Sequence, residues 1–248
     1  MYQQLAKRQS IRKAMIIVSL LLFPVIMNYL SPYIIIDGAA QGIVNASLIV
    51  FGLQFVSALF VGRLWCGWAC PAAGLGEVCF SINNKPVNQK ANWIKWLIWF
   101  PWIALIVMLV IRAGGYQRVD FFYLTESGIS IDEPFKYIIY YIVVGVFLAL
   151  SVFVGRRAGC HTICWMAPFM ILGRKLRNLG NWPALRLTAE TEKCINCKRC
   201  TRDCPMSLDV NGMVQAGAME HSECVLCGTC VDVCPKDVIH YAFSKGAR

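Results

Sequence analysis

Residues 60–71 read FVGRLWCGWACP, and residues 153–164 read FVGRRAGCHTIC. In both stretches Phe-Val-Gly-Arg ends an apolar segment, and two cysteines with three residues between them follow closely. The similarity of the two stretches predicts an internal repeat in which each half of the chain supplies an apolar hairpin and one C-x3-C pair. If each pair lies in a helix, its two cysteines are four positions apart and share one face of that helix.

The composition is that of a chain with much of its surface in lipid. Of the 248 residues, 57% are hydrophobic and only 15% are charged, whereas soluble proteins carry roughly 25% charged residues. The formal net charge is +10, but the basic residues flank the apolar segments and form no continuous stripe. This arrangement favours a membrane as partner over nucleic acid.

Four uncharged runs predict four membrane-spanning helices, since about 20 apolar residues cross the hydrocarbon core. The runs cover residues 14–36, 38–62, 96–111 (between Lys95 and Arg112) and 137–155. Lys and Arg gather before the first run, after the second and after the fourth, whereas the loop 113–135 is acidic. The positive-inside rule therefore predicts a multi-pass protein of the cytoplasmic (inner) membrane with both termini in the cytoplasm. We expect an α-helical membrane domain over residues 1–178, built as two repeated hairpins.

On this topology both C-x3-C pairs, Cys66/Cys70 and Cys160/Cys164, lie at the cytoplasmic membrane surface and face each other. Three interpretations are open. The four thiolates hold one iron–sulfur cluster or metal ion, or they are redox-active thiols, or they pack as small buried residues. The repeat favours the first, because packing alone does not require cysteine four times.

The C-terminal part carries the strongest motif. Residues 194–205 read CINCKRCTRDCP and residues 224–235 read CVLCGTCVDVCP, each of the form C-x2-C-x2-C-x3-C-P. In bacterial two-cluster ferredoxins this run binds [4Fe-4S] clusters, and its fourth cysteine serves the other cluster. We therefore expect an α+β ferredoxin domain over residues 188–248. One cluster is expected on Cys194, Cys197, Cys200 and Cys234, and the other on Cys224, Cys227, Cys230 and Cys204. A zinc site needs only four ligands, and disulfides are rare in the cytoplasm.

The sequence contains no motif typical of a haem or flavin site. None of the three histidines lies inside a predicted span, so the axial ligands of a membrane haem are missing. No Gly-rich dinucleotide fingerprint precedes a helix, so no flavin is expected. His161 could accept a proton from a quinol if its pKa lay near neutrality, with Arg63 and Arg156 at the quinone head. Surface polar contact and membrane orientation are the plainer roles of these residues.

Basic residues surround the first ferredoxin run, namely Lys193, Lys198, Arg199 and Arg202. They form either a solvated face or a docking patch for an acidic redox partner protein, because complementary charge speeds encounter.

With these motifs in view, the chain resembles the NapH family of membrane-bound ferredoxin-type proteins, and the NosR-type polyferredoxin proteins are similar. CGWACP at residues 66–71 matches the family motif, whereas CHTICW at 160–165 has Trp165 where proline is expected, with Pro168 following later. The resemblance implies four spans, two C-x3-C-P motifs at the cytoplasmic surface and two [4Fe-4S] clusters. It also implies quinol dehydrogenase activity that feeds electrons onward.

The function expected is electron transfer between the quinone pool, or a membrane partner, and a redox partner. It would use the two clusters and the C-x3-C site, as the electron-transfer subunit of an oxidoreductase complex. An alternative is an assembly or maturation factor that reduces a metal ion or thiols for another enzyme. A third hypothesis is a structural anchor for a redox complex.

Overall fold

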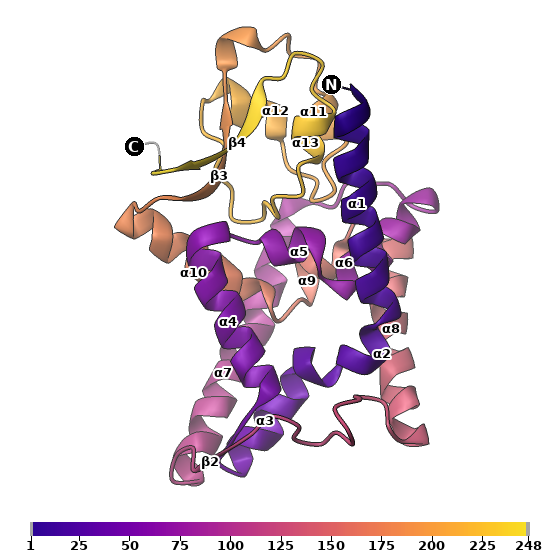
Figure 1. Ribbon diagram of the computed structural model, residues 1–248, viewed down its shortest axis with the longest axis vertical. Helices are drawn as coiled ribbons and strands as arrows, with labels where there is room; N and C mark the ends of the chain where they lie inside the picture. Colours follow the sequence, from indigo (N-terminus) through magenta and orange to yellow (C-terminus); the bar gives the residue numbers. More distant parts are fainter. Residues whose placement is uncertain (1, 247–248) are drawn as a thin grey trace.

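The molecule is an elongated set of helices with a small cap at one end, as Figure 1 shows. The structure is a computed structural model that describes residues 2–246. The cap is the C-terminal part of the chain, and the first turns of α1 reach up beside it. The cysteine-rich segments lie in the cap and in the helical layer directly beneath it.

The helical part contains most of the secondary structure. Its α-helices are α1 (Tyr2–Leu21), α2 (Phe23–Ile26), α3 (Pro32–Ala40), α4 (Ala46–Val61), α5 (Leu64–Trp68), α6 (Pro71–Val78), α7 (Ile94–Arg112), α8 (Pro134–Phe153), α9 (Ala158–Thr162) and α10 (Ala167–Gly180). Single 3-10 turns cover Asn28–Leu30 (η1), Cys79–Ser81 (η2) and Gln89–Trp93 (η3). At the end opposite the cap, β1 (Ile43–Asn45) pairs in parallel with β2 (Arg118–Asp120).

The cap is a small α+β unit. Strands β3 (Ala184–Ala189) and β4 (Ile239–Ser244) pair in an antiparallel ladder, with Ala184 opposite Ser244 and Ala189 opposite Ile239. Between them lie η4 (Thr191–Lys193), α11 (Arg199–Arg202), α12 (Val210–Gln215) and α13 (Thr229–Asp232). The strands hold the ends of the two cysteine runs together, since one run follows β3 and the other precedes β4.

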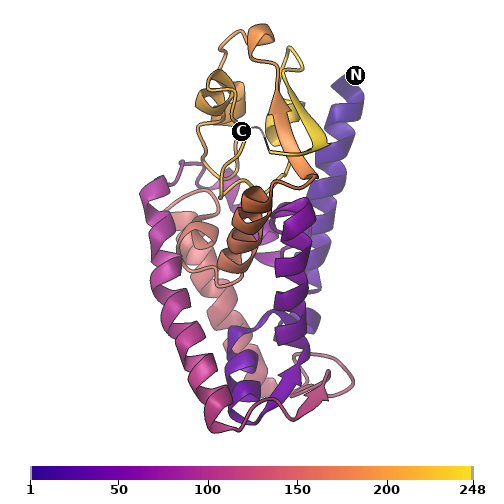
Figure 2. The ribbon, with the colours of Figure 1, turned by 90° about the vertical axis from the view of Figure 1, so that its left-hand side faces the viewer.

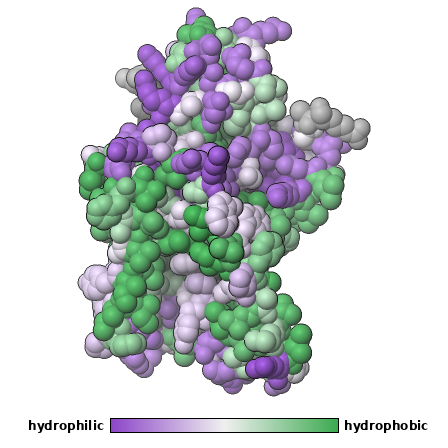
Figure 3. Space-filling model, turned by 180° about the vertical axis from the view of Figure 1, so that it is seen from behind, coloured by the Kyte–Doolittle hydropathy of each residue, from purple (hydrophilic) through white to green (hydrophobic). Residues whose placement is uncertain are grey.

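Among residues 2–246, two helices are long and apolar enough to cross a membrane, the continuous stretch Gln89–Arg112 and Pro134–Phe153. They expose large apolar side chains, for example Ile111 (73% exposed) and Phe153 (82%). Figure 3 shows apolar surface over the helical part and mostly hydrophilic surface over the cap. The other two predicted spans are shorter or broken, because α4 has 16 residues and the first run is interrupted.

The first apolar run, 14–36, is not one helix. It comprises the end of α1, then α2, η1 and the start of α3. Pro24 lies in the first turn of α2 and Pro32 in the first turn of α3, where a proline without an N–H is tolerated but an earlier helix cannot continue through it. The chain therefore turns inside the helical part, which leaves space beside α8.

The internal repeat is visible in the backbone. A long helix (α4 or α8) is followed within two residues by a glycine with positive φ, Gly62 at +59° or Gly155 at +139°. A five-residue helix follows, with the first cysteine of the pair at its third position, and then a helix with proline in its first turn. Pro168 thus takes the structural place of Pro71, so the departure at Trp165 shifts the proline without losing it.

The two halves pack across each other. Helix α6 lies against α1 of its own half and α8 of the other, and α10 lies against α7 of its own half and α4 of the other. Figure 2 shows α10 between α7 and α4, directly below the cap. This crossing brings both C-x3-C pairs to the middle of the layer that supports the cap.

Candidate electron-transfer site

The cap gathers its eight predicted ligands in two groups of four. Cys194, Cys197, Cys200 and Cys234 line one small cavity. Cys204, Cys224, Cys227 and Cys230 line a second. In each cavity the fourth cysteine comes from the other run, which is the crossed arrangement that the spacing predicts.

The backbone of the two runs is shaped in the same way. Non-glycine residues with positive φ recur 30 positions apart, at Asn196 (+53°) and Leu226 (+51°) and again at Ser207 (+52°) and Asp237 (+47°). Such residues are uncommon, and turns of this kind point successive N–H groups toward one side, where they can bind an anion. The N–H of Val238, for example, lies 3.4 Å from the sulfur of Cys234.

The four cysteines of the helical part form a separate, deeper group. Cys66, Cys70, Cys160 and Cys164 are 3–7% exposed, and they lie close enough for each to disfavour ionisation of its neighbours. Burial, followed by the neighbouring cysteines, raises the pKa of Cys164 to about 12. The N–H of Ala73 bonds Cys70, and the N–H of Ala167 bonds Cys164, so the second cysteine of each pair meets a helix N-terminus in the same way.

Buried cations surround this four-cysteine site. Arg12, Arg63, Lys95 and Arg157 are at most 2% exposed. Glu223 accepts from Arg63 at 2.7 Å and from Lys95 at 2.6 Å. Glu77 accepts from Arg12 at 2.8 Å and also from Arg157. Four cations therefore face two carboxylates, which leaves two buried positive charges without a carboxylate.

These contacts keep both carboxylates ionised. Burial alone would raise the pKa of Glu223, but Arg63 and Lys95 outweigh it and hold that pKa at about 2. The pKa of Glu77 is likewise lowered, because Arg157 and Arg12 outweigh its burial. The guanidinium groups of Arg12, Arg63 and Arg157 also keep their charge, whereas burial and nearby Arg63 lower the pKa of Lys95. The three guanidinium groups alone exceed the two carboxylates, so the site keeps an excess of positive charge.

The donor set fits a cubane cluster better than the alternatives. Unpaired buried charge is costly, and a [4Fe-4S] group on four thiolates carries a net charge of about −2, which balances the excess. Neutral thiols or disulfides would leave it unbalanced. Among residues 2–246, no three Cys, His, Asp or Glu side chains converge closely enough for a single metal ion. A cluster is wider than one ion, so it spreads its ligands further apart.

The four-cysteine site touches the second cavity of the cap. A Cβ on Gly67 would lie 2.3 Å from the carbonyl oxygen of Val225 and 3.4 Å from the Cα of Cys227, so only glycine permits this approach. Next to it, the indole N–H of Trp68 donates to the carbonyl of Leu226 at 3.1 Å. Arg157 lies near enough to Cys160 and Cys227 to interact with both thiols.

The three residues predicted to bind a quinone head group do not line any of the cavities found among the described residues. His161 is fully buried, its Nδ1 lies 2.8 Å from Oδ1 of Asn92, and its Nε2 has no partner. Burial, with nearby Lys95, lowers its pKa to about 4, so the expectation of a pKa near neutrality is wrong. Arg63 is bound to Glu223, and Arg156 donates to the carbonyl of Cys204 at 3.3 Å.

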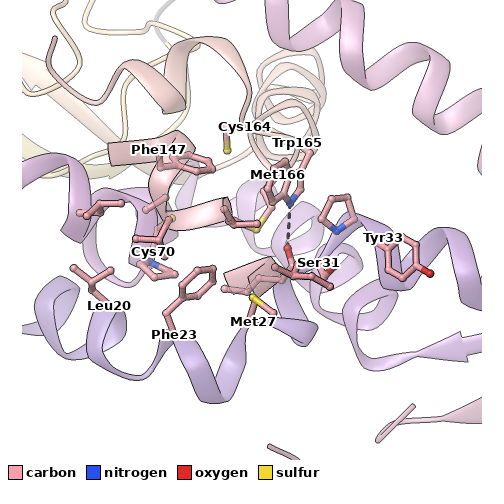
Figure 4. Close-up of a pocket in the computed structure, with 18 residues that line it drawn as sticks. Leu20, Phe23, Met27, Ser31, Tyr33, Cys70, Phe147, Cys164, Trp165 and Met166 are labelled. Atoms are coloured by element: carbon pink, nitrogen blue, oxygen red, sulfur yellow. Dashed lines mark hydrogen bonds between the residues drawn. The ribbon is translucent and has the colours of Figure 1, made fainter. Parts of the chain in front are cut away.

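An apolar cavity that the sequence did not predict opens on the other side of the four-cysteine site. It has a volume of about 270 Å³ and reaches Cys70 and Cys164. Figure 4 shows Phe23 and Met27 on one wall and Phe147 and Trp165 on another. The signal in the sequence was Pro24, because a break in an apolar run leaves a helix bundle incompletely filled.

Two family models match the chain. One, described as a 4Fe-4S dicluster domain, covers residues 193–239. The other, described as a 4Fe-4S binding domain, matches twice, at residues 45–86 and 138–180. Each of its matches contains one C-x3-C pair, which agrees with the internal repeat.

Relatives resemble most of the chain. An uncharacterized protein of Methanocaldococcus jannaschii, MJ0749, is 25% identical over 204 residues, 82% of this chain and 74% of that protein. YccM of Escherichia coli, whose name refers to electron transport, is 24% identical over 82% of this chain and 57% of its own length. The ferredoxin-type protein NapH of Escherichia coli is 24% identical over 88% of this chain and 76% of its own. No solved structure matches the chain.

Sequence similarity and the cysteine cavities together define the class, an electron-transfer protein of the ferredoxin type that carries 4Fe-4S clusters. Within this class, the chain is similar to the NapH-type ferredoxin-type proteins and shares their 4Fe-4S family models.

Proposed function

We propose that the chain is a multi-pass protein of the cytoplasmic membrane that exchanges electrons between the quinone pool and a redox partner protein in the cytoplasm. The cap would hold two [4Fe-4S] clusters in its two cavities, and Cys66, Cys70, Cys160 and Cys164 would hold a third. When bound, such clusters supply one-electron transfer. The residues of the chain hold the thiolates, exclude water and balance the charge.

One observation carries this proposal, namely that the four-cysteine site lies between the cap and the apolar cavity. Gly67 packs directly on the backbone beside Cys227, and Cys70 and Cys164 line the apolar cavity. The site therefore meets a cluster cavity on one side and an apolar space on the other. A protein that only carried electrons in water would need no such space.

The proposed membrane arrangement is supported by the distribution of apolar and basic residues. The two apolar helices α7 and α8 run from the level below the cap to the opposite end, and α4 is a shorter apolar helix. The loop 113–135 lies at that opposite end and is acidic, whereas Arg156, Arg157 and Arg174 lie near the cap. By the positive-inside rule, this distribution supports a cap that lies in the cytoplasm.

The maturation hypothesis has less support from the geometry. A thiol that reduces a metal ion or a disulfide of another protein must be reached by it, and reactive cysteines are partly exposed. Cys66, Cys70, Cys160 and Cys164 are all buried under the cap. Their contacts favour a bound group over exchange with a partner.

The test uses the full chain, purified without oxygen and placed in liposomes. We expect about 12 iron atoms per chain. After reduction with dithionite, added quinone should take up a pair of electrons with a pair of protons from water, and the EPR signals of the reduced protein should disappear. Iron-loaded protein that quinone does not re-oxidise would contradict the quinone link. Protein without iron would contradict the cluster assignment itself.

Sidedness is tested separately in intact cells. A C-terminal tag should be protected from protease added outside the inner membrane and become sensitive when the membrane is opened. A tag cleaved in intact spheroplasts would place the cap on the wrong side.

A further inference from the structure

The apolar cavity has walls from distant parts of the chain. Leu20, Phe23 and Met27 come from α1, α2 and the turn that follows, and Val143 and Phe147 come from α8. The cavity exists because the chain turns at Pro24 and does not continue as a straight helix alongside α8. Its lining is almost entirely apolar in the described part of the chain.

Aromatic side chains shape the inner end. Phe147 and Trp165 stack edge to face with ring centres 6.1 Å apart. The indole N–H of Trp165 donates to the carbonyl of Leu30 at 3.1 Å, so the polar atom of this ring is already satisfied. Figure 4 shows both rings with Phe23 and Met27 around the same space. Flat apolar walls of this kind suit a flat, uncharged ring.

The inner end is also where the cavity meets sulfur. Cys70 and Cys164, the second cysteines of the two pairs, border it. At about 270 Å³, the cavity exceeds an engineered apolar cavity of about 150 Å³ that binds benzene. A substituted ring can therefore enter and lie against both cysteines.

We infer that this cavity binds the ring of a membrane quinone, an inference that rests on the proposed function. The site replaces the predicted head-group site at His161, Arg63 and Arg156, whose side chains do not line the cavity. A lipid acyl chain is the competing occupant. The aromatic walls and the contact with Cys70 and Cys164 favour a redox-active ring over a saturated chain.

The experiment is photolabelling of the full-length protein in liposomes with an azidoquinone, competed by unlabelled quinone. Label should appear in peptides of α1 or α8. Val143→Trp fills the cavity and should abolish the competed label. Ile142→Trp is the matched control, because Ile142 is the neighbouring residue on α8, is 60% exposed and does not line the cavity.

A second variant guards against misfolding. Leu20→Trp fills the cavity from the opposite wall and should also abolish the label, and iron content is measured for every variant to confirm folding. Label that survives in folded Val143→Trp and Leu20→Trp protein would overturn the site. So would label that unlabelled quinone does not compete, with lipid found at these peptides, because the occupant would then be an acyl chain.

Failure of the proposed function gives a different result. If competed label is lost in Val143→Trp but quinone does not re-oxidise reduced wild-type protein, the binding site stands and the electron exchange is wrong. If wild-type protein is re-oxidised and Val143→Trp is re-oxidised equally fast, the exchange stands and this cavity is not its site.

Discussion

The first cavity of the cap and the four-cysteine site each place four cysteines beside cations, but the first is partly exposed to water and the second is buried. Cys197 is exposed, and the nearby cations Lys198, Arg199 and Arg202 are also exposed. The four cysteines below the cap are all buried, and Arg63 and Arg157 beside them are at most 1% exposed. The same kind of ligand is thus presented to water at one end and enclosed at the other.

The difference in exposure determines what each set of cations can do. An exposed cation is well solvated and contributes little to stability, but it can attract an acidic partner. A buried guanidinium cannot lose its charge and must be balanced locally. The outer cations therefore suit encounter with a partner, whereas the inner ones favour an anionic group on the four buried cysteines.

The largest effect is expected from removing one ligand of the enclosed group. Cys70→Ser should lower the iron content by about four atoms per chain, because a cubane needs all of its thiolates. Iron analysis with EPR measures the loss. Cys79→Ser is the matched control, since Cys79 is 2% exposed but lines none of the three cavities described. Equal iron content in the two variants would mean that the four cysteines pack as small buried residues and hold no cluster.

The next effect concerns the carboxylate that joins cap and helices. Glu223→Gln leaves Arg63 and Lys95 without their shared anion and should destabilise docking of the cap by about 3–5 kcal/mol. Denaturant unfolding and protease release of the cap measure it. Glu192→Gln, at an exposed position, should change neither. Because the pKa of Glu223 is lowered to about 2, its contribution is present above about pH 4.3 and is lost as pH falls toward 2.

The sequence predicts features whose residues lie close together in the chain, and it misses contacts between residues that are far apart in the chain. The two cysteine groups of the cap are predicted by the spacing within two short runs. The C-x3-C repeat is predicted by the similarity of residues 60–71 and 153–164. The ion pairs could not be predicted, because Arg63 and Glu223 are 160 residues apart and Arg12 and Glu77 are 65 apart. Arg63 ends the first Phe-Val-Gly-Arg stretch, but nothing in that motif names its partner. Only the packing of the cap on the helices, and of α1 on α6, reveals these pairs.

The broken first run shows a second limit. Its lack of charge predicted one span, but Pro24 and Pro32 divide it, and hydropathy does not register such breaks. The mostly helical fold is confirmed, with two helices long enough to cross a membrane. Four spans and the cytoplasmic cap remain predictions.

A smaller effect is expected where the two regions touch. Gly67→Ala places a Cβ 2.3 Å from the carbonyl oxygen of Val225, so the cap must shift, at a cost of about 1–3 kcal/mol. Electron exchange between cap and four-cysteine site should slow, as measured by rapid-freeze EPR after reduction of the cap. Gly52→Ala is the control, because a Cβ there meets nothing within 4 Å. Unchanged exchange in Gly67→Ala would mean that this contact does not set the distance.

The smallest effect is expected at the exposed end. Lys198→Glu removes a solvated cation beside Cys197 and should slow association with an acidic redox partner by up to about tenfold at low salt, and less as salt screens the charge. Stopped-flow reduction by an acidic soluble ferredoxin at several ionic strengths measures the rate. Lys245→Glu changes the net charge equally at another exposed position that does not line the first cavity. If both variants slow the reaction alike, net charge alone governs encounter, and the outer cations form no docking patch.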